Sequence, residues 1–185
     1  MITLVVGKPP SRLTVHEGIV ERLPFLSKAS LEEARRRLSG STDISLPDDD
    51  AALIVALIEY LKTGSYTYEH TDPESIPAVD LAQALFHLNL YATATKYKCP
   101  ELADAALKSV IWVLSELSAL DSLKVWQAGY KYGLSLDQLE PSGFKGLKSR
   151  MKELGTTDKH AFTDLVATCP ALASDLLALF AAELL

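Results

Sequence analysis

The stretch ISLPDDDAALIVALIEYLKTGSY, residues 44–66, joins a short strand pattern to a long helix pattern. Polar and apolar residues alternate over TDISLP at 42–47, and the alternation stops at Pro47, which is typical of a strand. Acids open the segment that follows, and Lys62 and Gly64 close it, in agreement with the helix dipole and with the preference for glycine after a helix C-terminus. The stretch therefore predicts a strand followed by a long helix.

The acids at the start of that helix and its apolar stripe each lead to a prediction. We expect Asp48 to cap its N-terminus and Asp49 and Asp50 to interact with its dipole, each contributing roughly 0.5 to 1 kcal/mol. A calcium loop would need oxygens at alternating positions and a distant bidentate acid, so the acids do not indicate a cation site. The apolar residues form a wide stripe: Leu53, Ile54, Leu57, Ile58 and Leu61. A stripe of this width predicts a central core helix.

The residues before this stretch predict a hairpin and two helices. ITLVVG at 2–7 and RLTVH at 12–16 are β-branched runs separated by KPPS, the pattern of two strands and a turn. From Glu17 the apolar spacing changes to threes and fours, which indicates a helix. A second helix is expected around residues 31–38, ending at Gly40.

The residues after this stretch are mostly helical in pattern. SYTYE at 65–69 is expected to add a brief fourth strand. Helices are then expected at 79–96, 100–114, 118–132, 141–154, 159–168 and 170–184. The fold class is therefore α+β, with an all-helical C-terminal part.

Composition and charge exclude several classes of function. A net charge of −6 argues against generic nucleic-acid binding, which relies on basic surface. The closing run LLALFAAELL is shorter than the ~20 residues of a membrane span, so no membrane association is expected. Cys99 and Cys169 are too few and too far apart for a disulfide framework or a metal site. We expect an intracellular protein, in the cytoplasm, the nucleus or both.

Three landmarks resemble the BTB/POZ family, in the family's order. LTVHEGIVERLPFL at 13–26 is similar to its second strand and first helix. The stretch at 44–66 is similar to its strand ending in Leu-Pro-Asp-Asp and the helix closing in Tyr-Leu-x-Thr-Gly. LYATATKYKCPELADAAL at 90–107 looks like its later helix pair. The sequences of these landmarks most resemble those of BTB proteins of filamentous fungi.

The resemblance implies a fold, a domain division and a function. It implies a small three- to four-stranded sheet capped by a helical bundle over residues 1–115, and a helical extension over 116–185. It implies a non-catalytic protein-interaction module that self-associates. A homodimer built around the first strand and first helix would use the apolar residues Ile2, Leu4, Ile19, Val20 and Leu23.

A cullin-binding site is a further implication of the resemblance. Cullin-binding BTB proteins carry a hydrophobic-x-Glu motif between the second helix and the third strand, and Leu31 and Glu33 occupy that place. The chain would then be a substrate adaptor of a cullin-type ubiquitin ligase. The same residues also suit the start of an ordinary amphipathic helix, and both interpretations remain open.

Two other classes of function remain as alternatives. One is a transcriptional co-repressor scaffold, which needs a DNA-binding partner because this chain has no basic recognition element. The other is an enzyme or small-ligand protein whose pocket lies at the junction between the BTB part and the helical tail, where His16, Tyr60, His87 and Tyr97 would converge. We expect no catalytic residue, cofactor or metal, because the histidines have no metal-ligand spacing and no serine lies in a nucleophile elbow. His16 is predicted to mark the joint between a strand and a helix.

Overall fold

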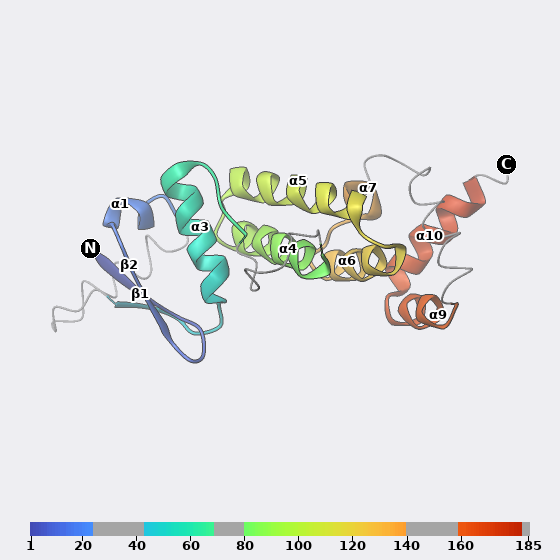
Figure 1. Cartoon of the computed structure of the whole chain (residues 1–185), viewed down its shortest axis with the longest axis horizontal. Helices are drawn as coiled ribbons and strands as arrows, with labels where there is room; N and C mark the ends of the chain where they lie inside the picture. The colour runs from blue at the N-terminus through green and yellow to red at the C-terminus, as the bar shows by residue number, and fades with distance from the viewer. Residues whose placement is uncertain (24–42, 69–79, 140–158, 183–185) are drawn as a thin grey trace. The chain divides into compact units, whose positions relative to one another are not determined.

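The computed structural model describes residues 1–23, 43–68, 80–139 and 159–182. The described part is α+β, with one small mixed sheet and a majority of helix (Figure 1). In chain order its elements are β1 (Ile2–Val6), β2 (Ser11–Val15), α1 (Glu17–Val20), β3 (Asp43–Leu46), α3 (Ala51–Thr63), α4 (Leu81–Lys96), α5 (Pro100–Glu116), α6 (Ala119–Lys131), α7 (Leu136–Leu139), α9 (Lys159–Thr168) and α10 (Pro170–Ala182). The predicted helices around 31–38 and at 141–154 lie outside the described residues.

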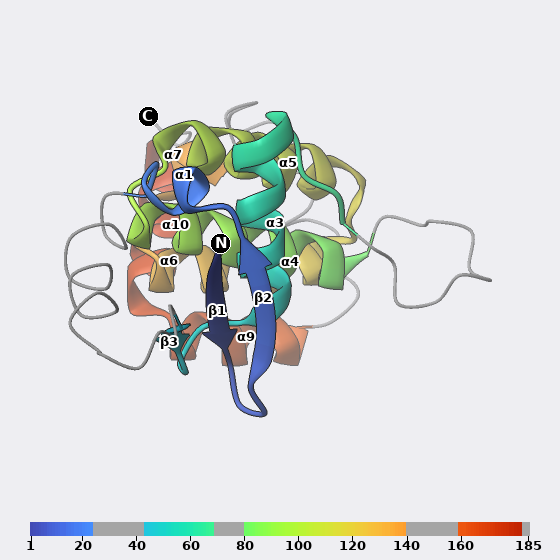
Figure 2. The ribbon, with the colours of Figure 1, turned by 90° about the vertical axis from the view of Figure 1, so that its left-hand side faces the viewer.

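The sheet has the order β2-β1-β3, as Figure 2 shows. β1 runs antiparallel to β2 and parallel to β3. Residues 65–68 of the predicted fourth strand form no strand, so the described sheet has three strands. β2 therefore lies at one edge of this sheet.

The two faces of the sheet differ in burial. Ile2, Leu4 and Val6 of β1 are buried, whereas Thr3 and Val5 between them are half-buried. Because side chains alternate across a strand, one face packs into the core and the other is more exposed. The apolar alternation in the sequence is the direct cause of this arrangement.

His16 lies between β2 and α1, as predicted. It is the N-cap of α1, and its Nδ1 accepts a hydrogen bond from the backbone N–H of Gly18 at 3.2 Å. A side chain that accepts from the first turn replaces one of the backbone partners that a helix N-terminus lacks. The histidine thus ends the strand and begins the helix.

α3 begins two residues later in its acidic run than we predicted. Its N-cap is Asp50, whose carboxylate accepts from Ala52 N at 2.7 Å and Leu53 N at 3.3 Å. The prediction that Asp48 caps the helix is wrong, because the helix starts at Ala51 and a cap must precede the first helical residue. Asp48 instead pairs with Lys8 at 3.1 Å.

The C-terminus of α3 matches its prediction. Gly64 has φ +78°, a left-handed conformation, and its N–H bonds to the carbonyl of Tyr60. Glycine reaches this conformation without the steric cost of a Cβ atom. The core side of α3 consists of Ile54, Ala56, Leu57, Ile58 and Leu61.

The chain comprises two compact units. The first comprises Met1–Asp72 and Asn89–Ala106, and the second comprises Pro73–Leu88 and Leu107–Leu185. The sheet, α1 and α3 belong to the first unit, and α6, α7, α9 and α10 belong to the second. The domain boundary after residue 115 stays a prediction.

The second unit is helical in its described part. α9 contacts both α6 and α10, and α6 contacts α7. Gly129 of α6 lies so close to Leu139 of α7 that an added Cβ would be 2.6 Å from a Leu139 methyl carbon. None of the described helices is long and apolar enough to cross a membrane.

Candidate functional site

The five residues predicted for a dimer interface are placed mostly in the core. Ile2, Leu4, Val20 and Leu23 are at most 2% exposed within the single chain. Ile19 is half-buried. A side chain already covered by its own chain has no surface to bury against a second copy, so Ile19 is the member of this set with surface to offer.

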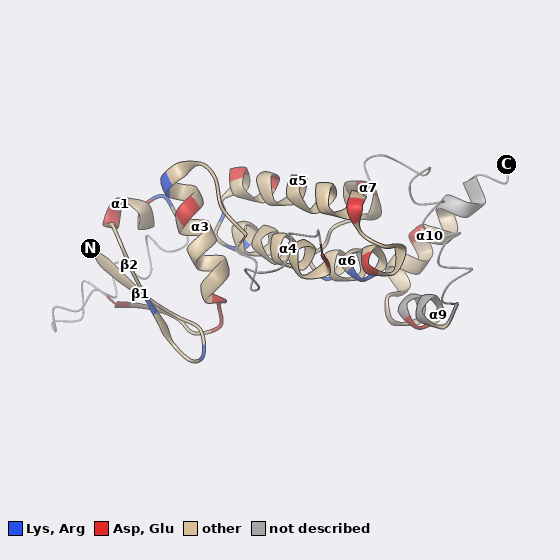
Figure 3. Ribbon diagram, in the orientation of Figure 1, with Lys and Arg blue, Asp and Glu red and all other residues tan. Residues whose placement is uncertain are grey.

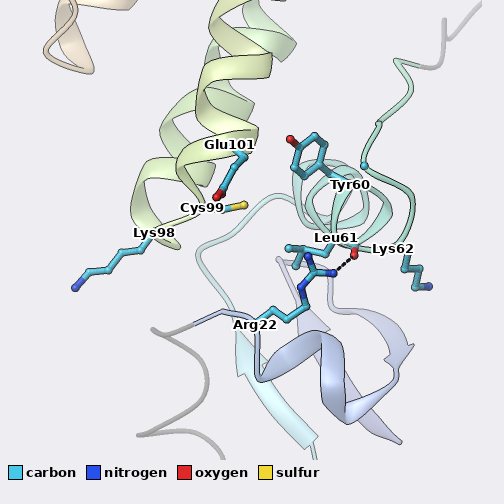
Figure 4. Close-up of a pocket in the computed structure, with 8 residues that line it drawn as sticks. Arg22, Tyr60, Leu61, Lys62, Lys98, Cys99 and Glu101 are labelled. Carbon is cyan, nitrogen blue, oxygen red and sulfur yellow. Dashed lines mark hydrogen bonds between the residues drawn. The ribbon is translucent and has the colours of Figure 1, made fainter.

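A cavity in the first unit measures about 590 Å³. It is lined from three segments, by Arg22, Tyr60, Leu61, Lys62, Gly64, Lys98, Cys99 and Glu101 (Figure 4). Arg22 donates from Nη1 to the carbonyl of Leu61 at 2.5 Å. This bond satisfies a carbonyl in the last turn of α3, where helix carbonyls lack intrahelical partners.

The cations around this cavity do not converge on one point. In Figure 4, Lys62 and Lys98 extend to opposite sides, away from the guanidinium of Arg22. Arg22 itself is held at the Leu61 carbonyl. The geometry is that of a structural contact at the end of α3, with no anion cradle formed by the three cations.

The four residues proposed for a ligand pocket have different surroundings. Tyr60 lines the cavity, but His16 and Tyr97 are not among its lining residues. His16 caps α1, and the Tyr97 hydroxyl donates to Asp49. His87 is buried in α4 of the second unit, with its ring edge-on to Phe86. The first unit thus does not gather His16, Tyr60 and Tyr97 around one pocket.

The described residues contain neither a cluster of metal-ligating side chains nor a concentration of cations on one element. Across residues 1–23, 43–68, 80–139 and 159–182, no group of three or more His, Cys, Asp or Glu residues is placed to hold a metal ion. Figure 3 shows Lys and Arg distributed over several elements. The basic run ARRRL at 34–38 lies outside the described residues.

Asp49 joins the start of α3 to the end of α4. Its carboxylate is 10% exposed and accepts from Lys96 Nζ at 2.6 Å and from the Tyr97 hydroxyl at 3.0 Å. Burial, followed by the charge and hydrogen bond of Asp49, raises the pKa of Tyr97 well above its ordinary value. Tyr97 therefore stays protonated as a donor at neutral pH, and the cluster is a structural link.

The Asp49 link leads to a first prediction. Asp49→Ala removes the acceptor of two charge-assisted hydrogen bonds, one of them also an ion pair, and should lower the free energy of unfolding by about 1 to 3 kcal/mol. Tyr97→Phe should cost about 1 kcal/mol, because it removes one of the same bonds. Urea unfolding of both single variants and the double variant checks this. Additive losses, with no coupling between the two sites, would contradict the link.

The cullin-contact residues Leu31 and Glu33 lie outside the described residues. Comparison of the chain with known family models, with curated proteins and with solved structures finds no match.

Proposed function

We propose that this chain is a non-catalytic protein-interaction module with the BTB/POZ fold, and that it self-associates. The observation that carries the proposal is the order and pairing of the elements. A β1-β2 hairpin, a short helix capped by His16, a parallel return of β3 beside β1 and the long helix α3 follow one another, and the pair α4 and α5 comes next. This is the order that the three sequence landmarks imply.

The landmarks support the proposal because their residues have specific structural roles. His16 is a helix cap, Asp50 starts α3 and Gly64 ends it with a positive φ. Such positions tolerate few residue types, so a sequence pattern that contains them is more informative than an equally long apolar pattern. Function by binding, without a reaction, is the consequence we draw from this type of fold.

Self-association is the first part of the proposed function. Two-fold dimers use one self-complementary patch twice. Of the predicted interface residues, Ile19 on α1 has surface to contribute, whereas Val20 and Leu23 are buried. A polar substitution at Ile19 is therefore the variant that addresses the dimer while leaving the core residues in place.

Adaptation to a cullin-type ubiquitin ligase is the second part. We propose that Leu31 and Glu33 contact the cullin, and that another region recruits the substrate. A pulldown with purified cullin compares wild type, Glu33→Ala and the neighbouring control Glu32→Ala. Binding by wild type and Glu32→Ala, but not by Glu33→Ala, is the expected result. If neither the wild type nor either variant binds the cullin, the adaptor role is removed and the co-repressor scaffold is favoured.

An intracellular location belongs to the same proposal. Cys99 is a buried free thiol and Cys169 is a half-buried one, and neither forms a disulfide. Free thiols persist in the reducing cytoplasm and nucleus. Both compartments contain the partners that an adaptor or a co-repressor would bind.

A further inference from the structure

The free edge of the sheet belongs to β2, and the backbone directions along it follow from the pairing. Gly7 donates its N–H to the carbonyl of Leu46 in β3, so the carbonyl of Val6 points the other way, toward β2. In an antiparallel pair, hydrogen-bonded and non-hydrogen-bonded residue pairs alternate. Ser11, Leu13 and Val15 therefore bond to β1. Arg12 and Thr14 direct their N–H and C=O groups outward.

These outward groups have no backbone partner in the described part of the chain. The backbone hydrogen bonds found there outside helices and strand ladders include none from Ser11–Val15. Arg12 and Thr14 thus present two donors and two acceptors in the spacing of a strand. An edge of this kind is a template for one more strand.

A groove runs beside this edge, between β2 and α3, with a volume of about 450 Å³. Its lining residues include Arg12, Leu13 and Thr14 of β2 and Val55, Ile58 and Lys62 of α3. Its aliphatic part includes Val55, which is 46% exposed, and half-buried Leu13. Because Val55 is exposed next to an unpaired strand edge, an apolar side chain of an added strand could pack against it.

The charges in the groove favour an acidic occupant. Arg12 is 72% exposed in its side chain and lies 3.6 Å from Asp43, a long ion pair. Lys62 adds a second cation. Among the described lining residues the one acid is Glu59, which already accepts from the backbone N–H of Thr67 at 3.1 Å and from its hydroxyl at 2.7 Å. A carboxylate beside Arg12 would therefore meet a cation.

We propose that this edge binds an extended acidic peptide segment of a partner protein, which adds to the sheet as a strand next to β2. The residue opposite Leu13 is aliphatic and packs against Val55 and Ile58, and a neighbouring residue, opposite Arg12, carries the carboxylate. This inference rests on the proposed interaction function and names one surface and one partner class for it.

A peptide fits this edge better than a second copy of the chain. Pairing β2 with the β2 of another copy would place both α3 helices on the same face of the joined sheet. Neighbouring strands are about 4.8 Å apart, whereas packed helix axes need about 8 to 10 Å. Since α3 packs on β2 itself, a second α3 would compete for the same space. A single extended strand avoids this conflict.

The test uses the full ¹⁵N-labelled chain and two acetylated, amidated heptapeptides. One has the sequence Thr-Glu-Val-Glu-Val-Glu-Thr, and its charge-reversed control has Lys in place of each Glu. In titrations to about 2 mM, the acidic peptide should shift the Arg12 and Thr14 amides and slow their hydrogen exchange. The control should bind at least about tenfold more weakly, because it places cations beside Arg12.

A matched pair of variants tests the backbone geometry. Thr14→Pro removes an outward N–H without breaking the ladder to β1, since proline is tolerated at edge positions whose N–H faces away. Thr14→Val keeps the N–H. The acidic peptide should bind Thr14→Val like wild type and should bind Thr14→Pro at least about tenfold more weakly. Unchanged shifts of the Leu4 and Val6 amides of β1 in the free variants show that the sheet is intact.

Several results would overturn this inference. They are no shift with the acidic peptide, shifts away from β2, equal binding of both peptides, or equal binding by both variants. Shifts of Arg12 and Thr14 that depend on protein concentration without peptide would assign the edge to a second copy. If the chain self-associates through α1 and the peptide does not bind, the peptide inference fails and the proposed function stands. If the chain is a strict monomer but binds the peptide, self-association fails and the peptide inference stands.

Discussion

Trp126→Ala should lower the free energy of unfolding by about 3 to 5 kcal/mol, the usual cost of removing a large buried aromatic side chain. Trp126 lies in α6 and is fully buried. It is also among the largest side chains in the described core. The substitution leaves a cavity that the surrounding helices can close only in part. Urea unfolding followed by circular dichroism measures the loss.

The indole nitrogen makes the Trp126 prediction more specific. Trp126 Nε1 is buried with no hydrogen-bond partner among the described residues. An unpaired buried donor costs roughly 1 to 3 kcal/mol, so Trp126→Phe should recover part of the volume loss and cost about 1 kcal/mol. Trp112→Ala is the control, because Trp112 is 58% exposed. A Phe variant as unstable as the Ala variant would contradict this account.

The second large effect concerns pH and His87. Burial lowers the pKa of His87 from 6.5 to about 4. Between these two values the unfolded chain binds a proton that the folded chain does not, so the free energy of unfolding falls as the pH falls. The loss from pH 7 to pH 4 should reach about 3 kcal/mol, at about 1.4 kcal/mol per pK unit. Above pH 7 this contribution is constant.

The His87 prediction is a difference measurement, because carboxylates also titrate in this range. Unfolding free energies of wild type and His87→Gln are compared at several pH values between 4 and 7. The wild type should lose more stability than the variant on acidification, and the difference should grow steadily below pH 6.5. His160→Gln, at an exposed histidine, should track the wild type. Parallel curves for wild type and His87→Gln would rule out the burial effect.

Local signals in the sequence predicted most of the described secondary structure. The strand before Pro47 and the helix that ends at Gly64 were placed within a few residues, because proline and glycine act on the backbone directly. The cap was misplaced from Asp50 to Asp48, because any of three consecutive acids satisfies the same local preference. Only the actual start of the helix separates them.

The sequence does not distinguish burial within one chain from burial at an interface between copies, for a physical reason. An apolar residue in a strand or helix marks a covered face, but the sequence does not say whether the cover is the same chain or another copy. Ile2, Leu4, Val20 and Leu23 are covered by their own chain.

The edge of β2 was missed as a site. Its signal was present in SRLTV, where Arg12 and Thr14 alternate with Leu13 and Val15. That alternation indicates a strand with one exposed face. That its backbone also faces outward depends on the strand order, since β2 would lack a free edge if it were the central strand. The strand order depends on contacts between segments that are distant in the sequence, and local patterns do not reveal it.

The mass of the full chain in solution tests the central claim of a self-associating module most directly. Size-exclusion chromatography with light scattering at about 50 µM should give twice the monomer mass of 20.2 kDa for wild type. Ile19→Asp should shift the mass toward the monomer, because it places a charge on the exposed part of the α1 patch. A wild-type chain that stays strictly monomeric at this concentration would contradict the account.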